Sequence, residues 1–147
     1  MKLKGKVKPG YGVASGKGGD LRFPEGTIRQ QWPHFKKRGL DLSQYFPGTV
    51  NVDITPYTIR IKSPKHYFDK IDWSEHIPPE NFYFFDVTVT HNRADYQGLI
   101  YLPDPSTKSE HFQGASVLEL LLPKIEGLKY DASIEISVKE DQISMEI

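Results

Sequence analysis

The chain has 147 residues, with 19 Lys and Arg against 19 Asp and Glu, no Cys, and 37% hydrophobic residues. This length supports a single domain over residues 1–147 with one core, and the lack of cysteine excludes disulfides, thiolate metal sites and cysteine nucleophiles. Because the formal net charge is zero, no overall field gathers nucleic acid, which is therefore not an expected partner.

Hydropathy gives no sign of a membrane segment. A spanning helix needs about 20 apolar residues, whereas the apolar run from Val117 to Pro123 is short and is interrupted by Glu119. The basic stretch from Met1 to Lys6 is not followed by the apolar core of a signal peptide. We therefore expect a cytoplasmic protein without a membrane partner.

The first predicted element is a strand, because lysines alternate with other residues from Lys2 to Lys8. Five glycines then occur among the ten residues of segment 10–19. Their spacing does not fit a Walker A loop. A backbone cradle for phosphate and a flexible connection both remain open for this segment.

A short amphipathic helix follows. Thr27 and Gln30 have the spacing of a capping box, and apolar residues recur at helical intervals at Ile28, Trp32 and Phe35. Pro33 interrupts this pattern. Either the helix begins at Thr27 and is kinked, or it begins near Trp32 with the proline in its first turn.

The remainder of the chain is dominated by β-forming residues. Residues 63–81 are interpreted as a long connection, and 82–90 with 98–102 as a hairpin. Strands are predicted by alternation over 2–8, 49–55, 57–62, 82–90, 98–102, 117–122, 133–138 and 142–147. About eight short strands with one helix favour a mainly β fold that closes into a small barrel, since closure removes exposed sheet edges.

Thr49 and Asn51 lie two residues apart at the start of a predicted strand. Their side chains therefore project to the same face, where a hydroxyl and an amide can bind Mg²⁺ together with phosphates. The alternative is an ordinary polar row that faces solvent.

Glu119 interrupts an apolar strand and shares a face with Val117 and Leu121. A carboxylate in an apolar row must be hydrogen-bonded, paired or functional. Alternatively, this row is the partly covered, open side of the barrel.

The order of these pieces resembles that of the archaeal CTP-dependent riboflavin kinases. The similarity covers most of the chain, and its most specific piece is the sequence Pro-Gly-Thr-Val-Asn-Val at 47–52, which resembles the family's Gly-Thr-Leu-Asn segment. The other pieces are residues 5–12, 35–40 and 117–123. The resemblance implies a closed six-stranded cradle-loop barrel of the RIFT type, with additional short strands and one or two short helices.

The resemblance also implies a reaction, the Mg²⁺-dependent transfer of the γ-phosphoryl group of CTP to the 5′-hydroxyl of riboflavin, which gives FMN. Thr49 and Asn51 would hold the metal, and Glu119 would be the catalytic, flavin-contacting carboxylate. Thr107 matches a second flavin contact. The expected nucleotide-binding residues are Gly10, Tyr11, Gly12, Val13, Ala14, Ser15 and Lys124.

We expect CTP and riboflavin as partners and a monomeric protein. The alternative is a non-catalytic barrel of the same type that binds a small molecule, a nucleotide or a protein partner. Magnesium dependence separates the two, because only the phosphotransferase requires the metal for turnover.

Overall fold

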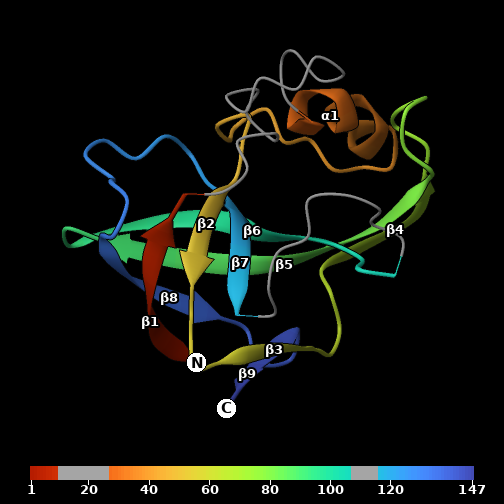
Figure 1. Ribbon diagram of the computed structural model, residues 1–147. Coiled ribbons are helices and arrows are strands. Elements are labelled where there is room, and N and C mark those ends of the chain that lie inside the picture. The colour runs from red at the N-terminus through yellow and green to blue at the C-terminus, as the bar shows by residue number, and fades with distance from the viewer. Residues whose placement is uncertain (10–26, 107–115) are drawn as a thin grey trace.

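The computed structural model describes residues 1–9, 27–106 and 116–147, and in these ranges the protein is mainly β (Figure 1). Its elements are β1 (Lys2–Lys8), α1 (Thr27–Lys37), β2 (Val50–Asp53), β3 (Thr58–Ile61), β4 (His66–Ile71), β5 (Glu80–His91), β6 (Ala94–Pro103), β7 (Val117–Leu121), β8 (Ser133–Val138) and β9 (Ile143–Glu146). Within the described part of the chain, no helix has the length and apolar character required to cross a membrane.

Six strands close into an antiparallel barrel. The ring runs in the order β5-β6-β7-β2-β1-β8, and β8 pairs with β5 to complete it. The prediction of a mainly β fold with a closed six-stranded barrel is therefore confirmed. β4 pairs with β5 outside the ring, and β3 and β9 form a separate two-stranded ribbon.

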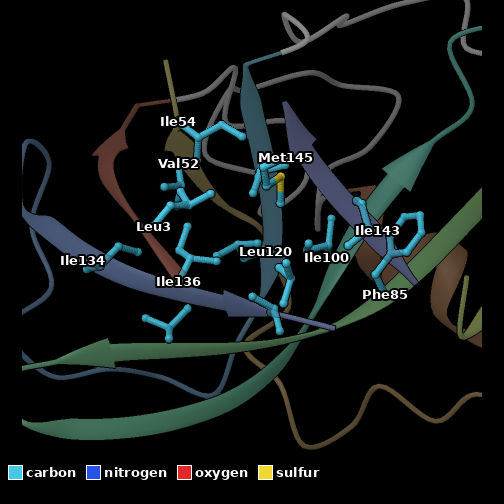
Figure 2. Packing of buried hydrophobic residues seen from close by; sticks show 14 of the residues in the cluster. Leu3, Val52, Ile54, Phe85, Ile100, Leu120, Ile134, Ile136, Ile143 and Met145 are labelled. Atoms are coloured by element: carbon cyan, nitrogen blue, oxygen red, sulfur yellow. The ribbon is translucent and has the colours of Figure 1, made fainter. Parts of the chain in front are cut away.

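Because side chains alternate along the strands, apolar side chains fill the barrel, as Figure 2 shows. Every second residue of each ring strand faces inward, so a single cluster collects side chains from all six strands and from the β3–β9 ribbon. Its labelled members in Figure 2 are Leu3, Val52, Ile54, Phe85, Ile100, Leu120, Ile134, Ile136, Ile143 and Met145.

A second apolar cluster covers the outer face of β5, β6 and β7, where α1 packs (Figure 1). Ile28 and Phe35 of α1 are almost completely buried, and between them Gln31 is 2% exposed. These three residues recur at helical spacing, so one face of the helix lies on the sheet. The sheet contributes side chains that alternate with those of the barrel interior, including Phe82, Phe84, Leu99, Tyr101 and Leu121.

Close approach of β6 and β7 depends on Gly98. A Cβ atom at this position would collide with the Leu121 carbonyl oxygen and would lie 2.6 Å from Leu122 Cδ2. Glycine therefore permits the backbone contact that joins these two strands.

The structure corrects the prediction for residues 63–81 and decides between the two predicted starts of the helix. The structure contains β4 inside the segment interpreted as a connection, 63–81. The helix includes Pro33 and extends back to Thr27. It continues through the proline because residues on both sides of it, Ile28 and Phe35, are anchored in the same apolar cluster.

Candidate functional site

The predicted site residues of β2 and β7 meet on the outer face of the barrel. Asn51 is the direct cross-strand partner of Glu119, and direct partners share a face of the sheet. The flanking residues Val52, Leu118 and Leu120 belong to the barrel interior. Asn51 and Glu119 therefore project outward, toward the side on which α1 packs.

Thr49, the residue immediately before β2, lies beside this pair. Its hydroxyl donates a hydrogen bond to Glu119 Oε1 at 3.3 Å. The structure thus brings together Thr49, Asn51 and Glu119, three residues that the sequence resemblance assigned to one site. We call these three residues the polar triplet.

The polar triplet is partly enclosed. Asn51 is only 8% exposed, while Thr49 and Glu119 are half-buried. Glu119 is hydrogen-bonded, as the prediction for a carboxylate in an apolar row required. Asn51 is not the solvent-facing polar residue of the alternative interpretation.

Tyr101 borders the triplet on its other side. It is the cross-strand partner of Glu119 on β6, and its phenol donates a hydrogen bond to Gln31 Oε1 of α1 at 2.7 Å. Burial raises the pKa of Tyr101 well above its usual value, and the negative charges of Glu119 and Glu80 raise it further. The phenol therefore stays protonated and remains a donor to the helix.

Tyr101 and Gln31 were missed as site residues in the sequence. Helical spacing offers a signal for Gln31, which lies three residues after Ile28 and four before Phe35, on the buried face. The signal for Tyr101 is a polar group within an apolar strand. Neither pattern reveals that the two side chains meet.

The other predicted residues have different positions. Lys124 follows β7 with its side chain 76% exposed, and its ammonium lies 3.9 Å from Glu126 Oε1, so its ion-pair partner lies outside the polar triplet. The remaining predicted contacts lie outside the described residues, namely Gly10, Tyr11, Gly12, Val13, Ala14, Ser15 and Thr107.

Thr49 and Asn51 of the polar triplet offer a hydroxyl and an amide carbonyl, two oxygen ligands that Mg²⁺ accepts. Because the Thr49 proton is directed to Glu119, the lone pairs of the hydroxyl oxygen are left for a cation. The described ranges hold no group of three or more His, Asp or Glu residues arranged for a metal. Two protein ligands leave the other coordination positions of Mg²⁺ to water and phosphate oxygens.

No protein-family model matches this chain, and no curated protein matches it significantly.

Removing the Tyr101 hydroxyl tests how firmly α1 is fixed beside the triplet. Tyr101→Phe should lower the free energy of unfolding by about 1–3 kcal/mol, because it leaves the buried Gln31 amide oxygen without its donor. Urea denaturation measures this loss. Tyr130→Phe is the control, since Tyr130 is 67% exposed, and equal stability of the two variants would contradict the expected role of the hydrogen bond.

Proposed function

We propose that this protein is a Mg²⁺-dependent riboflavin kinase, which transfers the γ-phosphoryl group of CTP to the 5′-hydroxyl of riboflavin. The observation that carries the proposal is the convergence of Thr49, Asn51 and Glu119 from two neighbouring strands. The segments that contain these residues are also those that resemble the riboflavin kinases. The choice of CTP and riboflavin as substrates rests on that resemblance.

Thr49 and Asn51 would hold Mg²⁺, which when bound neutralises phosphate charge and aligns the reacting groups. Thr49 is oriented by its hydrogen bond to Glu119. Asn51 is held between two strands and is largely shielded from water. Both side chains therefore have restricted orientations before a ligand binds, which lowers the entropic cost of alignment.

Glu119 acts on the acceptor. Its carboxylate accepts the proton of the 5′-hydroxyl while that oxygen forms a bond to the γ-phosphorus. The bond between the γ-phosphorus and the β,γ-bridging oxygen breaks, and CDP leaves with the electron pair. The hydrogen bond from Thr49 to one carboxylate oxygen orients the carboxylate for this transfer.

Glu119→Gln tests this role while preserving side-chain shape. We expect kcat for FMN formation to fall about a hundredfold, because an amide cannot accept the proton. The dissociation constant for riboflavin, measured by quenching of flavin fluorescence, should change much less. An unchanged kcat would exclude Glu119 as the proton acceptor.

A further inference from the structure

A lysine extends the polar row beyond the triplet. Lys8 of β1 is the direct cross-strand partner of Asn51, just as Glu119 is its partner on the other side. Direct antiparallel partners have Cβ atoms about 4.5–5.5 Å apart and share a face. The Lys8 side chain therefore emerges beside Asn51, on the outer face of the barrel.

Lys8 belongs to a row that alternates with buried residues along β1. Leu3 and Val7 point into the barrel, which directs the lysines outward. The four lysines have different neighbours. Lys4 lies opposite Glu135 of β8 in the strand register, whereas Lys8 is the lysine that lies opposite Asn51.

Neither of the nearby carboxylates, those of Asp131 and Asp53, forms a strong ion pair with Lys8. Its ammonium lies 3.9 Å from Asp131 Oδ1, but the two side chains are 40% and 76% exposed, and an ion pair of this kind contributes little. Asp53 is held by Thr55, whose hydroxyl and backbone amide both donate to it. Those hydrogen bonds lower the pKa of Asp53, with a smaller contribution from the charges of Lys8 and Lys6.

We propose that Lys8 binds the terminal phosphate of the nucleotide and so makes the site selective for triphosphates over diphosphates. This inference rests on the proposed function. A phosphate held by a metal at Thr49 and Asn51 lies beside the strand from which Lys8 projects. The lysine side chain is flexible, so the ammonium can leave Asp131, whose Oδ1 atom at 3.9 Å is beyond hydrogen-bond distance. It can then donate a charge-assisted hydrogen bond to a phosphate oxygen, which is stronger than the contact with Asp131.

Isothermal titration calorimetry with CTP and with CDP, both in the presence of Mg²⁺, measures the two dissociation constants and tests the proposal. Lys8→Gln should weaken CTP binding about tenfold, the loss of one charged hydrogen bond, and should weaken CDP binding by less than about threefold. Lys8→Arg should retain most of the CTP affinity because it keeps the charge. Lys4→Gln is the matched control, with the same change on the same strand and face.

Each outcome decides the question. If wild-type protein binds CTP and Asn51→Ala loses that binding, but Lys8→Gln binds like wild type, the role of Lys8 is overturned and the proposed function stands. Equal losses in the Lys8→Gln and Lys4→Gln variants, or equal losses for CTP and CDP, also overturn it. If wild-type protein binds no CTP, the proposed function fails and the role of Lys8 fails with it.

Discussion

Replacing Asn51 with alanine is expected to lower kcat/KM for FMN formation about a thousandfold, the upper range for loss of one preorganised polar group that stabilises transition-state charge. Asn51 is enclosed between Lys8 and Glu119 on the neighbouring strands. The remaining activity should show little dependence on Mg²⁺ concentration, because one of the two expected protein ligands is gone.

Steady-state kinetics over a range of Mg²⁺ concentrations measure this effect. Thr88→Ala is a suitable control, since Thr88 lies on β5 and its hydroxyl bonds to the exposed side chain of Gln97. A circular dichroism spectrum like that of wild type would show that Asn51→Ala is folded. Wild-type activity in a folded Asn51→Ala variant would contradict the assigned role, and ligand binding that is independent of Mg²⁺ would favour the non-catalytic alternative.

Of the substitutions named here, Phe35→Ala should lower the free energy of unfolding most. Phe35 is fully buried, and its ring lies 5.0 Å from that of Phe82, 5.1 Å from that of Phe84 and 6.0 Å from that of Phe68, measured between centroids. Truncation creates a cavity between α1 and the outer face of the barrel. We expect the free energy of unfolding to fall by about 3–5 kcal/mol.

Chemical denaturation measures this loss, and Phe46→Ala provides the control. Phe46 is 43% exposed, so the same truncation there removes less buried surface and should lower the free energy of unfolding by only about 1–2 kcal/mol. A loss below about 1 kcal/mol for Phe35→Ala would mean that α1 is not anchored through this side chain. Because α1 also carries Gln31, which binds Tyr101, loosening the helix should disturb the neighbourhood of Glu119.

Strand alternation was sufficient to predict most of the barrel. The hairpin of β5 and β6 follows from dense β-forming residues on either side of a turn, and Asn92 and Arg93 at that turn have positive φ angles. β4 was missed because its alternation fails. The register shifts between Phe68 and Ile71, where Lys70 has a φ of 51°, so two buried residues lie three apart instead of two.

The candidate site was predictable only in part. Alternation indicates that Thr49 and Asn51 share a face, and that Glu119 needs a polar partner. It cannot indicate that they meet, because Thr49 and Glu119 are 70 residues apart and their contact depends on which strands become neighbours in the closed ring. The contact between Tyr101 and Gln31 depends in the same way on where the helix packs.

A chromatographic assay for FMN shows whether the protein is a riboflavin kinase. Purified protein, shown to be folded by cooperative unfolding, is incubated with riboflavin, Mg²⁺ and either CTP or ATP. We predict FMN with CTP, much less FMN with ATP, and none when Mg²⁺ is removed by chelation. If FMN forms with neither nucleotide, this barrel is not a riboflavin kinase.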